Sequence, residues 1–537
     1  MKHRWGVIIL VAVVSFATGG WLVQRGVAGD GNVYQSARLF DDVLRHIDAY
    51  YVDSIGETEL YHHAIDGLIE QLEDPYTALL EGKDFKRLTE TTTGNYGGLG
   101  IQIDVRDGWI TVVAPLPDTP AERAGIESGD QIIEVDGVST EGWTSDQAVS
   151  TLRGADGSKV AIGIRRAGGA STLTFDITRA VIHVRSVPPG TLLDDGIGYL
   201  SLNPVSEASA DELKREIVAL RARGMRSMVL DLRRNPGGLL NQGVAVADLF
   251  LDPGQEVVST RGRARGSTRE FPAHNAQQWP DMPIVVLVNR FSASAAEIIA
   301  GALQDHDRAV LIGETTFGKG LVQTLYRLGS STALKLTTAR WYTPSGRTIQ
   351  RYQAGIGRQR HLALVDSVPE DDTTGTVFRT DAGRPMRGGG GVTPDISIAT
   401  DTLTTDEQNF VRTLGEDLPR YRDAITSYAL ELKDEGSISD PAFTVTRAMR
   451  HALYTRLTER GATLSESDFD AAGKLVDDQL AYEIARYVFG RDAEFQRRYH
   501  DDSQIQAALD LLRRATTPEQ LMALAAARTA ADGSSND

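Results

Sequence analysis

The chain has 537 residues, of which 41% are hydrophobic, so it is too long for one core and is expected to form several domains. It contains no cysteine, which excludes disulfides, thiolate metal sites and a cysteine nucleophile. The 56 Lys and Arg residues against 73 Asp and Glu residues give a net charge of −17, which argues against a nucleic-acid-binding protein. The one basic run, 261-RGRARGSTR-269, is expected to be a solvated hairpin tip.

Residues 1–28 are predicted to be a signal anchor or a signal peptide. Positive residues precede an uncharged run from Trp5 to Val23 that is long enough to cross the hydrocarbon of a bilayer. A cleaved signal peptide usually has a shorter apolar region, although Gly26-Val27-Ala28 offers a poor cleavage site. We favour one uncleaved helix in the inner (cytoplasmic) membrane. With either type of segment, the rest of the chain is exported to the cell envelope or periplasm.

The remaining chain divides by its periodicity into successive segments. They are a helical region at 29–93, a β-rich stretch at 94–180, an α/β region at 181–400, a helical region at 401–527 and a disordered tail at 528–537. Short apolar runs broken by glycine predict the β-rich stretch, and alternating strand and helix patterns predict the α/β region. Residues 353–391 are expected to be a long loop or insertion. The fold class is therefore multidomain α/β and α+β.

The stretch 290-RFSASAAEIIAGALQ-304 predicts a helix that begins near Ser294. Ser294 followed by Glu297 ahead of an apolar run is the pattern of a capping box. The serine is therefore either a cap for free backbone N–H groups or a nucleophile. On this stretch alone the cap is the commoner role, because no histidine stands close enough in sequence to suggest a base.

A lysine lies between two glycines ahead of an apolar strand in 313-GETTFGKGLVQTLYRL-328. Side chains alternate along a strand, so Lys319 and Gln323 are expected on one face. A phosphate loop is disfavoured because the GxxxxGK[ST] pattern and a following helix are missing. A neutral lysine can activate a serine if burial lowers the lysine pKa from about 10.4 toward neutrality. A neutral amide can orient that amine without stabilising its charged form.

The stretch 229-VLDLRRNPGGLL-240 predicts a strand, a glycine turn and then a helix. The backbone N–H groups of Gly237 and Gly238 at such a turn can stabilise an oxyanion, together with the Ala295 N–H beside the serine. Taken alone, this stretch is only a turn signal. Beside the serine and the lysine, it completes a set of groups suited to acyl transfer.

These stretches resemble the carboxyl-terminal processing proteases, also called tail-specific proteases, of the serine peptidase class. The motifs are DLRRNPGG (231–238), NRFSASAAEIIAGAL (289–303) and GETTFGKGLVQ (313–323). The resemblance covers about residues 35–398 and implies a catalytic dyad of Ser294 and Lys319, assisted by Gln323. It implies a PDZ domain inserted within the larger protease unit. No cofactor or metal is expected.

The β-rich stretch resembles a PDZ domain in 97-GGLGIQI-103 and 119-TPAERAGIESGDQIIEVDGV-138, although another small β domain is an alternative. A PDZ domain implies that the C-terminus of an unfolded protein or peptide is held as substrate. The peptide-binding candidates are Gly98, Leu99, Gly100, Ile101, Ile103, Val149 and Leu152. Arg153 is either a residue that couples the PDZ position to activity or a surface arginine at a turn.

The predicted function is a serine endopeptidase that cleaves exported proteins near their C-termini. A serine–histidine hydrolase using His306 is one rival, but this histidine is expected past the end of the helix that Ser294 begins. A crotonase-like acyl-CoA enzyme is disfavoured by the export segment and the PDZ pattern. A non-catalytic PDZ scaffold would not require the serine, the lysine and the glutamine. A homo-oligomer is expected as well, and an adaptor protein is left open.

Overall fold

The computed structural model describes residues 33–166, 171–351 and 376–534, and divides the chain into two compact units, Met1–Leu79 and Leu80–Asp537. The first unit contains the helices α2 (Val33–Tyr50) and α3 (Glu57–Glu70), as the apolar spacing predicts. The strand β1 (Ala78–Glu81) spans the boundary between the units. The predicted anchor lies outside the described residues, and within them no helix is both long and apolar enough to span a bilayer.

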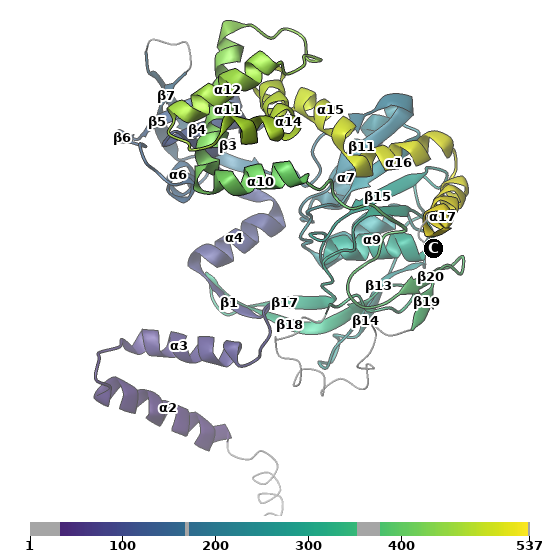
Figure 1. Cartoon of the computed structure of the whole chain (residues 1–537). Helices are drawn as coiled ribbons and strands as arrows, with labels where there is room; N and C mark the ends of the chain where they lie inside the picture. Colours follow the sequence, from purple (N-terminus) through teal and green to yellow (C-terminus); the bar gives the residue numbers. More distant parts are fainter. Residues whose placement is uncertain (1–32, 167–170, 352–375, 535–537) are drawn as a thin grey trace, which may run out of the picture. The chain divides into compact units, whose positions relative to one another are not determined.

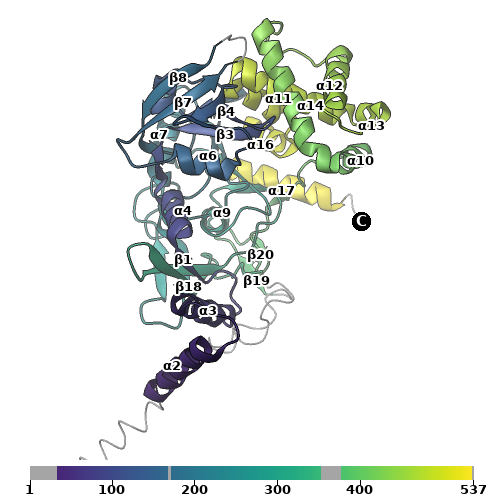
Figure 2. The same ribbon diagram turned by 90° about the vertical axis from the view of Figure 1, so that its left-hand side faces the viewer.

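The second unit opens with α4 (Gly82–Thr93) and a β-rich domain. Its main sheet has the order β3-β4-β5-β7-β8, with β6 beside β5, and β2 pairs separately with β9. The strands are β2 (Asn95–Gly98), β3 (Ile101–Arg106), β4 (Trp109–Pro115), β5 (Gln131–Val135), β6 (Val138–Ser139), β7 (Lys159–Arg165), β8 (Leu173–Thr178) and β9 (Ala180–His183). The helices are α5 (Pro120–Arg123) and α6 (Ser145–Leu152). The helix α6 contacts β3, and Figure 2 shows the helix beside this strand.

The α/β core contains a six-stranded sheet in the order β10-β11-β12-β15-β16-β21. Its strands are β10 (Thr191–Leu192), β11 (Ile197–Ser201), β12 (Ser227–Asp231), β15 (Ile284–Val288), β16 (Val310–Gly313) and β21 (Ile396–Ser397). The strands from β11 onward are parallel and are covered on both faces, which explains their continuous apolar runs. A 3₁₀ turn, Asp194–Gly196, precedes β11.

One face of this sheet packs against α7 (Ser209–Ala222), α8 (Leu240–Asp248) and α9 (Ala295–Asp305). The other face packs against α16 (Ser503–Arg514) and α17 (Pro518–Ser534). Figure 1 shows α9 and the two C-terminal helices beside the sheet. The sequence predicted a separate C-terminal helical region that begins at residue 401. Its last two helices, α16 and α17, instead complete the α/β core.

A second sheet contains β13 (Glu256–Arg261), β14 (Arg269–Pro272), β17 (Leu321–Arg327) and β18 (Thr332–Tyr342). The basic run forms the antiparallel turn between β13 and β14, as predicted. The long-loop prediction for residues 353–391 is wrong at its C-terminal end, where β19 (Val377–Arg379) and β20 (Pro385–Arg387) form a hairpin. The Asp381 N–H donates to the Asp305 carbonyl, so this hairpin is held at the end of α9.

The remaining C-terminal helices have a core of their own, which includes Phe410, Leu453 and Leu480. They are α10 (Thr405–Leu414), α11 (Leu418–Glu435), α12 (Arg447–Glu459), α13 (Glu466–Ala471) and α14 (Gly473–Ile484), with a 3₁₀ turn at Gly415–Asp417 and a π-helical turn at Ala485–Phe489. The next helix, α15 (Arg491–Asp501), packs instead through Phe495 and Tyr499 into the core on the second face of the α/β sheet. The predicted disorder over residues 528–534 is wrong, because α17 continues to Ser534. Alanine has a high helix propensity, so an alanine-rich segment forms a helix even when its other residues are small and polar.

Candidate active site

Ser294 lies at the start of α9, directly after the turn that leaves β15. Its backbone has φ 55° and ψ −118°, an unusual conformation for a residue with a side chain. Ser294 and Glu297 form the predicted capping box, and the Glu297 N–H also donates to the Ser294 carbonyl oxygen at 2.8 Å. Ser294 is thus the N-cap of α9, which does not by itself decide between the capping and the nucleophilic role.

The Glu297 carboxylate joins the serine segment to the lysine segment. One of its oxygens, Oε2, accepts from the Ser294 N–H at 2.8 Å and from the Lys319 N–H at 2.9 Å. The other, Oε1, accepts from the Gly318 N–H at 2.7 Å and from Thr316 Oγ1 at 2.5 Å. The backbones of Ser294 and Lys319 therefore lie within two hydrogen bonds of each other, although they belong to different elements.

Glu297 is fully buried. Burial raises the pKa of its carboxyl group, and the hydrogen bonds from Thr316 and from the three backbone N–H groups oppose that rise. The sequence predicted that Glu297 forms a capping box with Ser294, but not that it also binds the loop of Lys319. A glutamate buried inside an otherwise apolar helix was the available signal for more, because a carboxylate stays buried only with several donors.

Lys319 is half-buried in the loop that precedes β17, and its carbonyl oxygen accepts from Trp341 Nε1 at 3.0 Å. The neighbouring glycines are required by crowding. A Cβ on Gly318, which has φ 88°, would lie 2.8 Å from Arg351 Cβ, and a Cβ on Gly320 would lie 3.0 Å from the Gln350 backbone nitrogen. The Gly-Lys-Gly pattern thus fits a tightly packed loop that presents one amine.

Gln323 lies on β17, and its Nε2 donates to Thr337 Oγ1 at 3.4 Å. The register with β18 shifts between Val322 and Gln323, but the extra residue, Thr338, lies on β18, so this shift does not break the alternation along β17. However, Lys319 lies before the first residue of the strand. Strand alternation alone therefore does not place the amide beside the amine.

The Asn-Pro-Gly-Gly turn packs directly against the serine. A Cβ on Gly237 would lie 2.8 Å from both Ser294 Cβ and the Ala295 nitrogen, so only glycine fits. The Asn235 carbonyl accepts from the Ala293 N–H at 2.9 Å, which ties the two turns together. The predicted turn is thus adjacent to the predicted nucleophile.

The three N–H groups predicted to face an oxyanion differ in their partners. The Gly237 N–H donates to Asn235 Oδ1 at 2.8 Å and is therefore engaged. Among the described residues, neither the Gly238 N–H nor the Ala295 N–H has a hydrogen-bond partner. These two remain the available donors. The Asn-x-Gly spacing is a sequence signal of the side-chain turn that occupies the first one.

The histidine rival is excluded by position. His306 follows the last residue of α9, an 11-residue helix, so it lies about 18 Å along the axis from Ser294. Its Nδ1 contacts Asp381 Oδ2 at 2.7 Å and its Nε2 contacts the Glu256 carbonyl at 2.7 Å. Both ring nitrogens serve to hold the far end of the helix.

The peptide-binding candidates surround the open edge of a sheet. Among the strands that the structure describes, β3 pairs with β4 alone, so its other edge can accept an added strand beside α6. Leu99 is 3% exposed and belongs to the domain core with Leu152, whereas Ile101, Ile103 and Val149 are half-buried. The groove is therefore apolar.

The loop before β3 requires glycine at two positions. A Cβ on Gly100, which has φ 77°, would lie 2.3 Å from Thr119 Cβ, and a Cβ on Gly98 would lie 2.8 Å from the Tyr96 ring. Leu99 is buried between them, so the loop offers its backbone rather than side chains.

Comparison with known families and proteins agrees with this geometry. The model of the PDZ domain matches residues 88–165, and the model of peptidase family S41 matches residues 196–359. A carboxy-terminal-processing protease of Bartonella bacilliformis is 38% identical over 370 residues, which cover 68% of this chain and 83% of the relative. The chain belongs to the carboxy-terminal-processing proteases of family S41.

Two further similarities are found. The carboxy-terminal processing protease CtpA of Bacillus subtilis is 34% identical over 387 residues, covering 71% of this chain and 82% of the relative. Among solved structures, the photosystem II D1 C-terminal processing protease is 29% identical with a TM-score of 0.35, covering 69% of this chain and 90% of that one. The family membership makes the chain a serine-type peptidase with a PDZ domain.

In this protease Arg153 ends the PDZ helix α6 and is not a free surface arginine. Its NH1 donates to Glu90 Oε2 on α4, and its guanidinium carbon lies 4.4 Å from the centre of the Tyr96 ring. Burial raises the pKa of the Tyr96 hydroxyl, which the Arg153 charge opposes and the Glu90 charge supports. Arg153 thus connects the PDZ domain with the helix that precedes it.

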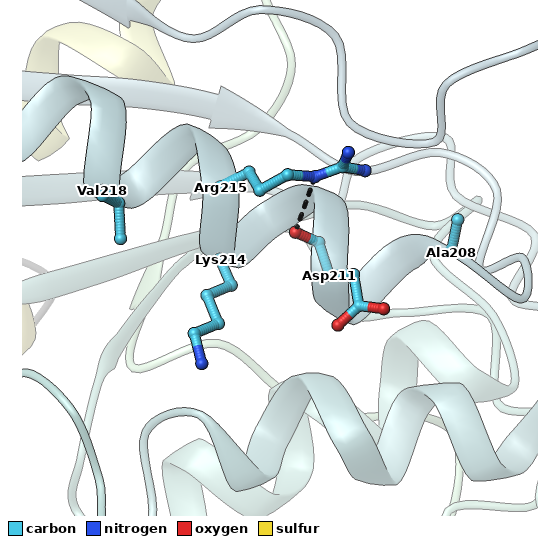
Figure 3. A pocket seen from close by; sticks show the side chains of 5 residues that line it. All are labelled: Ala208, Asp211, Lys214, Arg215 and Val218. Atoms are coloured by element: carbon cyan, nitrogen blue, oxygen red, sulfur yellow. Dashed lines mark hydrogen bonds between the residues drawn. The ribbon is translucent and has the colours of Figure 1, made fainter.

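A surface depression of the protease lies on α7 and is unrelated to the catalytic residues. It is lined by Ala208, Asp211, Lys214, Arg215 and Val218. Figure 3 shows Arg215 Nε donating to the Asp211 carbonyl, at 3.3 Å, beside an outward-pointing lysine. It shares no residue with the serine, lysine or PDZ sites.

Proposed function

We propose that this protease cuts polypeptides near their C-termini with a Ser294–Lys319 dyad. The supporting observation is the Glu297 carboxylate oxygen that accepts from the backbone N–H groups of both residues, while the glycine turn packs against the serine. Neutral Lys319 removes the proton from Ser294 Oγ as this oxygen attacks the scissile carbonyl. The N–H groups of Gly238 and Ala295 donate to the oxyanion that forms.

The reaction then needs three further proton transfers through the same amine. The Lys319 ammonium gives its proton to the leaving nitrogen, and the new amine terminus departs from the acyl-enzyme. Lys319 next removes a proton from water, which attacks the ester, and then returns this proton to Ser294 Oγ as the ester bond breaks, so that both residues regain their starting forms. Gln323 orients the amine without adding a charge that would favour its protonated form.

The proposal is tested in cells. Proteins are compared by their C-terminal peptides between cells that carry the native protease and cells that carry Ser294→Ala. Processed C-termini should appear only with the native protein. Identical sets of C-termini in both strains would contradict the proposed activity.

We place the site of action in the cell envelope. The support is the positive flank followed by the uncharged run from Trp5 to Val23, which suits one anchor in the inner membrane. The substrates would then be exported, unfolded chains. A homo-oligomer also belongs to the proposal, whereas the need for an adaptor protein is left open. Fractionation of cells and the mass of the purified assembly test these points.

Substrates are expected to be selected by a free apolar C-terminus. The loop at Gly98 to Gly100 offers backbone N–H groups to a carboxylate, and the half-buried Ile101, Ile103 and Val149 suit an apolar last side chain. We compare three peptides of identical body that end in a free carboxylate, an amide, or a free carboxylate after Asp. Amidation should weaken binding by roughly 1–3 kcal/mol. Equal cleavage of all three would show that the tail is not recognised.

Arg153 is expected to couple tail binding to turnover through its ion pair with Glu90. Arg153→Ala should reduce the stimulation of cleavage by an added C-terminal peptide by at least about fivefold. Glu90→Gln should have a similar effect, because it removes the other partner. Arg123→Ala, on an exposed face of α5, serves as the control. Unchanged basal and stimulated rates in Arg153→Ala would show that Arg153 is only a structural residue.

A further inference from the structure

The segment that leads into the glycine turn is fixed by a guanidinium. Arg233 Nε and NH2 donate to the two oxygens of Asp231, the last residue of β12, at 3.0 and 2.7 Å. Tyr199 on β11 donates its hydroxyl to the same carboxylate at 2.7 Å. Burial first, and the Asp231 charge second, raise the pKa of this tyrosine well above its usual value, so it remains a donor.

The remaining nitrogen of the Arg233 guanidinium, NH1, forms hydrogen bonds with two residues of the C-terminal region. Arg233 NH1 donates to Asp502 Oδ2 at 2.8 Å and to Gln504 Oε1 at 3.0 Å. Gln504 is 1% exposed, and its Nε2 donates to the Ile398 carbonyl at 2.7 Å. Its amide therefore has a fixed orientation, with the oxygen toward the arginine.

The position of these two residues is set by α16. Asp502 is the N-cap of this helix, where its Oδ1 accepts from the N–H groups of Gln504 and Ile505, each at 3.0 Å. The helix is packed against the sheet through Ile505, Leu509 and Leu512. Both side chains thus reach the arginine from a rigid support.

The restraint continues into the oxyanion turn. Arg234, which follows at once, has φ 59°, and its N–H donates to Asn289 Oδ1 at 3.0 Å. Asn235 comes next and donates from Nδ2 to the Leu202 carbonyl at 2.7 Å. A conformation of this kind persists only when its surroundings hold it.

We infer that Asp502 and Gln504 are positioning residues of the protease: through Arg233 they hold the turn that carries the Gly238 N–H. The inference rests on the proposed role of that N–H at the oxyanion. Donors of this type act only when their place is fixed before the reaction, and a displacement of about 1 Å can cost 10²-fold in rate. Both residues lie outside residues 196–359, which match the family model.

The test uses Asp502→Ser in the full-length chain. Serine still caps α16 but is too short to reach the arginine, so the two roles of Asp502 are separated. We expect kcat to fall about 10- to 100-fold while KM for a tail-bearing peptide stays within about twofold, because the PDZ groove is untouched. Gln504→Ala, which has no capping role, should lower kcat in the same way.

Two controls make the result specific. Asp510→Asn changes an exposed carboxylate on the same helix, whose neighbour is Arg513, and should leave kcat unchanged. In an Arg233→Ala background, Asp502→Ser should cause no further loss, because Asp502 acts through the arginine. A fully additive loss, or native kcat in both Asp502→Ser and Gln504→Ala, would overturn the inference. If Ser294→Ala remains active, the dyad itself fails instead.

Discussion

Ser294→Ala and Lys319→Ala are each expected to abolish peptide cleavage while thermal unfolding stays close to that of the native protein. Neither change removes the backbone hydrogen bonds to Glu297, so the fold retains its local support. Each rate should fall on the order of 10⁴-fold or more, and the double variant should lose little beyond either single one, because nucleophile and base act as a unit. Initial rates on one tail-bearing peptide measure this.

The protonation state of the lysine gives the control. Lys319→Arg should also be inactive, because a guanidinium cannot lose its proton in this pH range. The native rate should rise with pH, with an apparent midpoint below the free lysine value of about 10.4. An active Lys319→Arg variant would remove lysine from the mechanism. Native turnover in Lys319→Ala, together with loss in His306→Ala, would favour the histidine instead.

Glu297→Ala is expected to cost both stability and activity. The four hydrogen bonds that this fully buried carboxylate accepts would lose their acceptor. Unsatisfied buried donors make this change destabilising by on the order of 3 kcal/mol or more. Cleavage should be lost as well, because the carboxylate that links the backbones of Ser294 and Lys319 is then missing.

Glu297→Gln separates the two effects. The amide keeps the size of the side chain and one acceptor, but its NH₂ group meets two donors, which should cost about 1–3 kcal/mol. Glu270→Ala, at an exposed position of β14, is the control and should be neutral. Denaturant unfolding and initial rates are measured together. A Glu297→Ala variant that unfolds and cleaves like the native protein would show that the bridge is dispensable.

The local motifs of the site could be predicted because each is contained in a short stretch. The strand, turn and helix around Ser294, and the glycine turn at 235–238, are encoded by neighbouring residues. The bridging role of Glu297 could not be predicted from the sequence. Three of its four hydrogen-bond partners lie 19 to 22 residues downstream and contact it only in the folded core.

Two other differences have similar causes. The shared strand face of Lys319 and Gln323 depended on a strand that already includes residue 319, whereas β17 begins only at Leu321, and the residue pattern does not mark that boundary. The periodicity of residues 503–534 indicates helices, but it does not say which surface they cover. Their place on the α/β sheet follows from the shape of that sheet's second face, which no single segment encodes.

The placement of α16 and α17 also orders events during synthesis. The chain emerges from its N-terminus, so the second face of the sheet, with Val229, Val285 and Ile312, stays uncovered until residues 503–534 arrive. Until then a broad apolar surface faces the solvent and the glycine turn lacks its outer support. A chain whose synthesis stops earlier is therefore expected to aggregate rather than to form a working protease. Proteolytic activity is expected only when synthesis is nearly finished.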